Sequence, residues 1–104
     1  MVFLRISSKS ESKIERIAEI LLKEKLAIDL NIRRNIERLE YKKGKVHSTS
    51  IFLLTGKTKG LLFTTIDNRL VEEFGKNMPE IYSLPIVNMD WEQARQLPHY
   101  LKEV

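Results

Sequence analysis

An alternation with a period of two between Leu26 and Arg33 constrains the fold of this chain more than any other feature. Successive side chains of a β-strand point to opposite faces, so a period of two predicts a strand with one buried face. The alternation divides the segment into an apolar set, Leu26, Ile28, Leu30 and Ile32, and a second set, Ala27, Asp29, Asn31 and Arg33. The apolar parity then changes, which predicts a β-bulge or bend within Arg34–Arg38 because a one-residue slip exchanges the two faces.

Further strands are expected on both sides of this segment. The chain turns at Lys43-Gly44-Lys45, which predicts a hairpin bend, and Ile51–Thr55 is apolar on both faces, as a central strand is. Val2–Ile6 predicts a short first strand. Pro85–Met89 predicts the last strand, with Pro85 at its start because proline lacks a backbone N–H and suits a sheet edge.

Helices are predicted in three places. Apolar residues recur at helical spacing from Ile14 to about Lys25, after a cap either at Ser8, with Glu11, or at Ser10. Thr58–Asn77 favours a long helix that ends at Gly75, although residues 61–65 also fit a strand followed by a helix from Asp67. Asp90 predicts the cap of a closing helix that Pro98 kinks or splits, with Trp91 docking it onto the body.

The predicted order is βαββαβ plus a terminal helix, which is an α+β, ferredoxin-like fold. Two helices would cover one face of a four-stranded antiparallel sheet, and residues 1–104 would form a single domain. The other face needs a cover, which other subunits could supply. The candidates to lie on that second face are Ala27, Phe52 or Leu54, and Tyr41.

Composition narrows the class of protein. The chain has no cysteine, so neither a disulfide framework nor a thiolate site is available. No apolar run approaches the roughly 20 residues that span a bilayer. The N-terminus does not resemble a secretory signal, and we expect a cytoplasmic protein without membrane contact. The net charge of +4 is concentrated in the first half, which leaves a nucleic-acid-binding module as the alternative function, although no aromatic cluster supports it.

No catalytic motif is present. Gly56-Lys57-Thr58 lacks the earlier glycine of a phosphate-binding loop, because Ile51 occupies that position. The side chains that could bind soft metals, His47, His99, Met78 and Met89, have no recognisable ligand spacing. We therefore expect a non-enzymatic protein with no cofactor and no metal site.

Several short motifs together resemble the CutA family of divalent-cation-tolerance proteins. They are Leu21-Leu22-Lys23-Glu24-Lys25-Leu26-Ala27, Tyr41-Lys42-Lys43-Gly44-Lys45, Lys57-Thr58 and Tyr82-Ser83-Leu84-Pro85. The resemblance implies a ferredoxin-like homotrimer, related to PII-type signalling proteins, whose sheets pack together. The sequence departs from the family at Asp29, where the resemblance places a metal-associated cysteine, and at Glu80-Ile81, where it places His-Pro.

The candidate binding residues follow from that assembly. Asp29, Asn31 and Arg33 share one strand face and would point toward the subunit interface, where buried polar groups need partners. Tyr41 and Tyr82 each combine an apolar body with a hydroxyl that suits an interface. We predict that these five residues line clefts between subunits that take a small polar or anionic ligand. The alternative for the Asp29 trio is that it fixes the register of the trimer.

Overall fold

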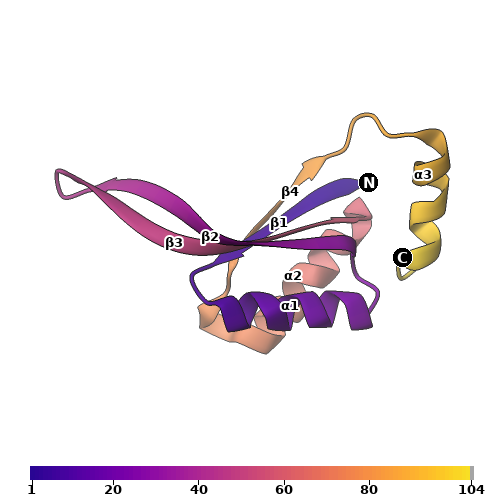
Figure 1. Cartoon of the computed structure of the whole chain (residues 1–104). Coiled ribbons are helices and arrows are strands. Elements are labelled where there is room, and N and C mark those ends of the chain that lie inside the picture. The colour runs from indigo at the N-terminus through magenta and orange to yellow at the C-terminus, as the bar shows by residue number, and fades with distance from the viewer. Residues whose placement is uncertain (104) are drawn as a thin grey trace.

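The computed structural model describes residues 1–103 and has the predicted order of elements (Figure 1). The strands are β1 (Val2–Ser8), β2 (Ile28–Lys42), β3 (Lys45–Thr58) and β4 (Glu80–Pro85), and the helices are α1 (Glu11–Lys23), α2 (Phe63–Phe74) and α3 (Trp91–Gln96). Short 3₁₀ turns span Gly60–Leu62, Gly75–Asn77 and Leu97–Tyr100. The strands form one antiparallel sheet in the order β2-β3-β1-β4, which confirms the ferredoxin-like α+β prediction. Within residues 1–103, no helix is long and apolar enough to cross a membrane.

The hydrophobic core lies between the sheet and two helices. Figure 1 shows α1 and α2 on the same side of the sheet. Ile6 of β1 pairs with Leu54 of β3, and Leu54 pairs with Ile32 of β2, so these side chains form one row facing the helices. Ala27 and Leu54 are each 1% exposed, and Phe52 packs against the same core. The prediction that Ala27 and Phe52 or Leu54 lie on the second face of the sheet is therefore wrong, because they fill the core beneath the helices.

The start of α1 and the end of α2 have local causes that the sequence indicated. The Ser10 hydroxyl accepts a hydrogen bond from the backbone N–H of Lys13 at 3.2 Å and so caps α1. The segment after β3 is helical, not a strand, and its buried side chains are Leu62, Ile66 and Leu70. Gly75 has φ +57°, a left-handed conformation that glycine adopts without strain and that ends α2.

Two irregularities interrupt β2. The register with β3 shifts between Arg33 and Ile36, which confirms the predicted bulge, and Asn35 has φ +57° there. A second shift lies between Ile28 and Asn31, where Asp29 has φ +52°. The sequence did not predict this second bulge, because the apolar alternation continues through it. Its effect is that Ile28 pairs with Lys57, so Ile28 does not share a face with Ile32 as predicted.

The C-terminal region differs from the prediction in two respects. The last strand ends at Pro85 instead of beginning there, because Pro85 pairs with Val2, the first residue of β1, and the backbone N–H of Ile86 makes one further hydrogen bond, to the Met1 carbonyl at 3.1 Å. Asp90 caps α3 as predicted, and the helix gives way to a 3₁₀ turn at Leu97, beside Pro98. Trp91 does not dock this helix, since its side chain is 85% exposed. Leu97 and Leu101 are buried and hold the segment instead.

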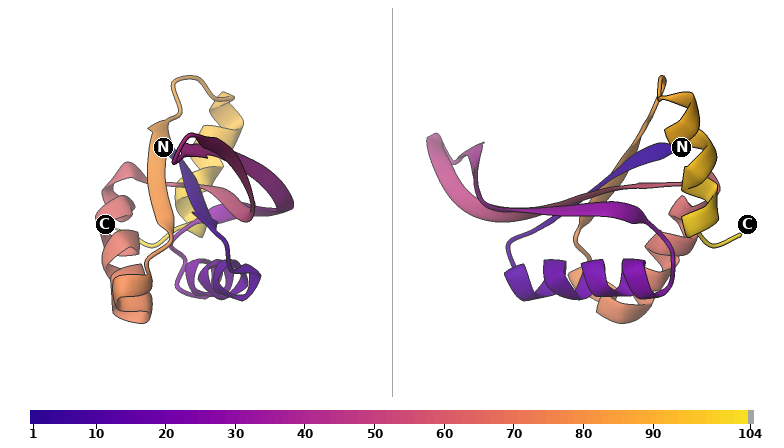
Figure 2. Two further views of the ribbon diagram at one scale, coloured as in Figure 1. Left: turned by 90° about the vertical axis from the view of Figure 1, so that its left-hand side faces the viewer. Right: turned by 45° about the vertical axis from the view of Figure 1, so that its right-hand side comes forward.

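The β2–β3 hairpin extends well beyond the rest of the sheet (Figures 1 and 2). β1 pairs with β3 only from Phe52 to Thr58, so residues 36–51 form a two-stranded ribbon. We call residues 36–51 the ribbon. Its strands are joined by Lys43 and Gly44, both with positive φ, which is the signature of a two-residue type I′ turn.

Candidate functional site

The sheet face opposite α1 and α2 carries most of the predicted site residues, and we call it the open face. Strand pairing aligns Tyr82, Arg5, Thr55 and Asn31 in one row across the sheet, and Glu80, Ser7, Leu53 and Arg33 in the next. Partners that lie directly opposite each other in adjacent strands point to the same face. Asn31, Arg33 and Tyr82 therefore share the open face. Asp29 reaches the same side, because its carboxylate pairs with Lys57.

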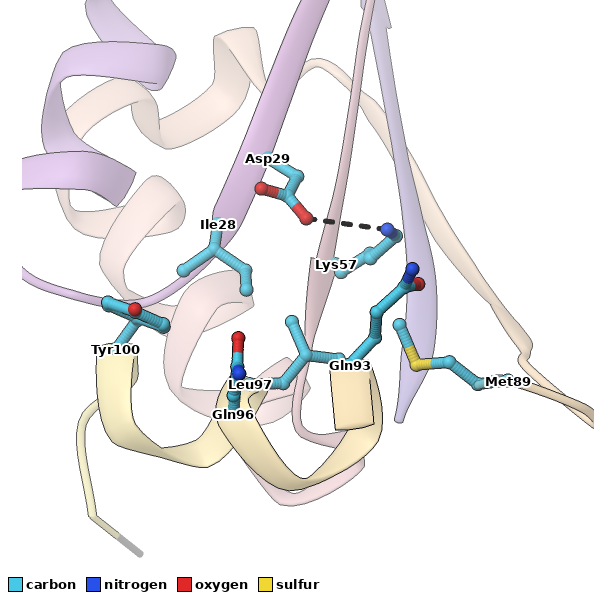
Figure 3. Close-up of a pocket in the computed structure, with 8 residues that line it drawn as sticks. All are labelled: Ile28, Asp29, Lys57, Met89, Gln93, Gln96, Leu97 and Tyr100. Carbon is cyan, nitrogen blue, oxygen red and sulfur yellow. Dashed lines mark hydrogen bonds and ion pairs between the residues drawn. The ribbon is translucent and has the colours of Figure 1, made fainter. Parts of the chain in front are cut away.

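Asp29 lies at the edge of a pocket between the open face and the C-terminal segment, which we call the C-terminal pocket (Figure 3). Its volume is about 510 Å³. Ile28, Met89 and Leu97 supply apolar lining, and the remaining lining residues are Asp29, Lys57, Gln93, Gln96 and Tyr100. Asp29 Oδ2 lies 3.3 Å from Lys57 Nζ at the polar end.

The second bulge of β2 places the Asp29 carboxylate at this pocket. Aspartate tolerates a left-handed backbone better than most residues, and the Asn31 side-chain amide donates a hydrogen bond to the Asp29 carbonyl at 3.1 Å. Asn31 therefore supports the bulge instead of lining the pocket. A cavity of several hundred Å³ with a few convergent polar groups is typical of small-molecule sites. The pocket offers one carboxylate, one ammonium and two carboxamides to such a molecule.

Arg33 and Tyr82 line a second, smaller concavity farther along the open face. We call it the arginine hollow, because Arg5, Arg33 and Arg38 surround it. The Arg5 guanidinium carbon lies 5.7 Å from the centre of the Tyr82 ring, a cation–π distance. Arg38 forms an ion pair with Glu80 at 3.2 Å.

Tyr41 lies apart from the other four predicted residues. It pairs with Val46 near the tip of the ribbon and is 75% exposed. Because the bulge at Asn35 reverses the parity, Tyr41 points to the opposite side from Arg38, and so not to the open face as predicted. Within one subunit the five residues therefore lie in four places: Asp29 at the C-terminal pocket, Asn31 beside it at the bulge, Arg33 and Tyr82 at the arginine hollow, and Tyr41 near the ribbon tip. Whether any of them binds a ligand stays a prediction.

Sequence reasoning missed several residues of these two concavities. Arg5 alternates with the buried Leu4 and Ile6, and that period of two was a signal that Arg5 faces away from the helices. Lys57 was noted only in the Gly56-Lys57-Thr58 and Lys57-Thr58 motifs, and Arg38 only in the range of the predicted bend and as part of the basic first half. Gln93, Gln96 and Tyr100 gave no signal, because only the tertiary fold brings α3 and the turn after it to the end of β2.

The donors for a soft metal ion are not gathered at a site. His47 is exposed near the ribbon tip, and its Nε2 lies 3.2 Å from the carbonyl oxygen of Lys42. Met89 lies at the C-terminal pocket, whereas Met78 packs against the core. Across residues 1–103 there is no group of three or more histidine, aspartate or glutamate side chains that could hold a metal ion. The donor set thus does not fit a copper or zinc site.

Much of the basic excess of the first half is paired with acidic side chains. Arg34 contacts Glu11 at 2.6 Å and Glu15 at 3.3 Å, and these hydrogen bonds raise the pKa of the Arg34 guanidinium. Lys23 pairs with Glu19, where its hydrogen bond lowers the pKa of the Glu19 carboxyl. Such surface pairs each contribute little to stability. They do, however, reduce the positive charge available to a nucleic acid. Nucleic-acid binding stays an untested alternative function.

Comparison with known proteins gives a consistent result. The family model described as CutA1 divalent ion tolerance protein matches residues 2–96. No curated protein matches the chain. A divalent cation tolerance protein (CutA1) from Thermus thermophilus is 27% identical with a TM-score of 0.82, and the match covers 98% of this chain and 100% of that one.

Two further solved structures extend the comparison. The periplasmic divalent cation tolerance protein CutA from Archaeoglobus fulgidus is 26% identical with a TM-score of 0.81, over 98% of this chain and 100% of that one. CutA1 from Oryza sativa has a TM-score of 0.84 at 24% identity, over 99% of this chain and 94% of that one. At that identity the rice protein supports the fold alone.

Proposed function

Because this chain belongs to the CutA1 divalent ion tolerance family, we propose that it acts as a homotrimeric, non-enzymatic binding or sensing protein. Three copies would cover the open face of one another's sheets and take a small polar or anionic ligand at the clefts between them. The number three comes from the resemblance to the family. The proposal assigns Asp29 to the ligand site in the C-terminal pocket, and Arg33 and Tyr82 to the covered face.

The observation that carries the assembly is the ribbon. An isolated two-stranded hairpin is marginally stable at best in water, yet this one extends past every other strand. On the side of the ribbon opposite to the open face, Leu39, Tyr41 and Val46 are 61%, 75% and 68% exposed, so in this proposal the ribbon is covered as well as the open face. Both outer strands of the sheet, β2 and β4, also have an unpaired edge, which favours pairing with another chain. Further copies would cover the apolar side of the ribbon, and pairing with another chain would satisfy the free strand edges.

Light scattering coupled to size-exclusion chromatography tests the assembly. The wild-type chain should elute with three times the mass of one chain at micromolar concentration. Leu39→Glu, which places a charge on the apolar side of the ribbon, should yield smaller species. Leu61→Glu is the matched control, because Leu61 is 77% exposed but lies away from the ribbon in the turn before α2. A wild-type monomer, or equal effects of the two variants, would contradict the proposal.

The ligand part of the proposal needs its own measurement. Calorimetry with copper, zinc and a panel of small polar metabolites should give saturable heat with a metabolite that Asp29→Asn weakens. Asp67→Asn offers a control, since Asp67 lies on α2 and does not line the C-terminal pocket. Tight copper binding that His47→Ala abolishes would contradict the exclusion of a soft-metal site.

The proposal also includes a cytoplasmic location. The relative from Archaeoglobus fulgidus is described as periplasmic, so the location of this chain has to be measured. Fractionation of the native host, with a marker enzyme for each compartment, would decide it. Recovery of this protein in any fraction other than the cytoplasm would overturn that part.

A further inference from the structure

The arginine hollow holds more positive charge than its acidic neighbour can balance. Arg38 has Glu80 as its partner, at 3.2 Å, and also lies 3.4 Å from the Ser7 hydroxyl. Arg5 and Arg33 form no ion pair within residues 1–103, whereas every other arginine of that part of the chain has a carboxylate partner. Two guanidinium groups at one concavity are therefore left without an anion.

Arg5 shows this imbalance at the level of one atom. Its Nε is buried and has no hydrogen-bond partner within the described residues. The Tyr82 ring lies against the guanidinium at 5.7 Å and restricts where the group can turn. A buried N–H of a charged group that has no acceptor is destabilising unless an acceptor arrives. The acceptor that best relieves this cost is itself negatively charged.

The remaining lining favours a small and strongly charged anion. The hollow has a volume of about 190 Å³, which is too small for a drug-sized molecule. Ile51 and Leu53, 5% and 6% exposed, form its apolar floor, which lowers the local dielectric and strengthens interactions between charges. Guanidinium groups present several N–H donors in a planar fork that matches the oxygens of phosphate or carboxylate. With one carboxylate already present, a doubly charged group balances the hollow better than a singly charged one.

We propose that the arginine hollow is a binding site for a phosphate group, either inorganic phosphate or the phosphate of a small monoester. Arg5 and Arg33 bind the phosphate oxygens directly, and Arg38 is held beside them by Glu80. This inference rests on the proposed function only in taking the open face as the covered face of the assembly. The hollow itself is built from β1, β2, β3 and β4 of a single chain.

The chain supplies a matched pair of variants for the test. Arg33 and Arg34 are adjacent in β2, but Arg33 lines the hollow while Arg34 pairs with Glu11 and Glu15 of α1. Arg33→Gln and Arg34→Gln therefore remove the same charge on opposite sides of the sheet. Titration calorimetry with inorganic phosphate, phenyl phosphate and sulfate, at constant ionic strength in chloride, compares both variants with the wild type.

We expect saturable phosphate binding that Arg33→Gln and Arg5→Gln each weaken about tenfold or more and that Arg34→Gln leaves unchanged. Tighter binding of phenyl phosphate than of inorganic phosphate would assign the site to a phosphomonoester, and the reverse order to the free ion. Equal weakening by Arg33→Gln and Arg34→Gln would overturn the inference.

The mass of each variant separates this inference from the proposed trimer. A trimeric wild type that binds no phosphate overturns the phosphate site but not the trimer. The same outcome is expected if a carboxylate of the partner subunit occupies the hollow in place of phosphate. A monomeric wild type that binds phosphate with the predicted variant pattern overturns the trimer alone. Weaker phosphate binding by Arg33→Gln at the wild-type mass supports the site, whereas weaker binding that accompanies a change of mass would mean that Arg33 acts through assembly and would overturn the site.

Discussion

Replacing Thr58 by valine should lower the free energy of unfolding by about 2 kcal/mol, although the two side chains have nearly the same shape. Thr58 is fully buried at the end of β3, and its hydroxyl donates a hydrogen bond of 2.6 Å to the carbonyl oxygen of Leu26. That bond joins the sheet to the segment that follows α1. Valine would remove the donor and leave the Leu26 carbonyl without this partner in a buried site.

The magnitude follows from the buried hydrogen bond. Leaving a buried acceptor unpaired costs about 1–3 kcal/mol. Thr58→Ser is the matched control, because it keeps the hydroxyl and removes one methyl group, for which we expect a cost of about 1 kcal/mol. With a urea m-value of about 1–3 kcal/mol/M for a small protein, the valine variant should shift the unfolding midpoint by about 0.7–2 M.

Urea unfolding followed by circular dichroism would measure both variants at one chain concentration, because assembly makes apparent stability depend on concentration. The serine variant should be the more stable of the two. Valine and wild-type proteins with the same midpoint, or a serine variant less stable than the valine variant, would refute the role given to this hydrogen bond.

Three other substitutions test separate features. Gly56→Ala should destabilise the fold by about 1–3 kcal/mol, since a Cβ there would clash with Leu30 Cδ2 and lie 3.1 Å from the Ile28 carbonyl oxygen; in thermal unfolding, Gly56→Ala should cost less in a Leu30→Ala background than in the wild type. Ser10→Ala should cost about 1 kcal/mol by removing the α1 cap, measured by urea unfolding against Ser12→Ala. Hydrogen bonds from Arg16 and, to a smaller extent, Arg69 lower the pKa of the Glu73 carboxyl. The ionised Glu73 side chain therefore stabilises the fold above the usual glutamate pKa, and this stabilisation is lost as the pH falls through the lowered pKa. Glu73→Gln should therefore make unfolding less sensitive to acid, and an unchanged pH profile would contradict this.

The alternation of residues 26–33 was enough to predict the second strand and the bulge near Asn35, because a change of parity is visible in the sequence. The bulge at Asp29 was not predictable, since the alternation of Ile28 and Leu30 runs through it unchanged. Pro85 was placed at the wrong end of β4, because the length of a strand depends on its partner and β1 begins only at Val2.

The candidate site was harder to predict than the fold. Asp29, Arg33 and Tyr82 do point to one side of the sheet, which a period of two can indicate. Their division between two concavities depends on strand order and on the packing of α3, which local patterns do not encode. The same limit explains the wrong prediction for Trp91. Its size favoured burial, but Leu97 and Leu101 occupy the buried positions and leave Trp91 exposed.

The two-residue turn at Lys43 and Gly44 has a consequence for the order of events during folding. The turn joins β2 and β3, the two longest strands, which are adjacent in sequence. Closing this short loop therefore costs little conformational entropy before the two strands begin to form hydrogen bonds. Hairpins of this kind form within about 1–10 μs, far faster than pairings between distant segments. We therefore expect the tip of the β2–β3 hairpin to pair early. The pairing of β1 with β4, which are separated by most of the chain, should limit the rate of folding.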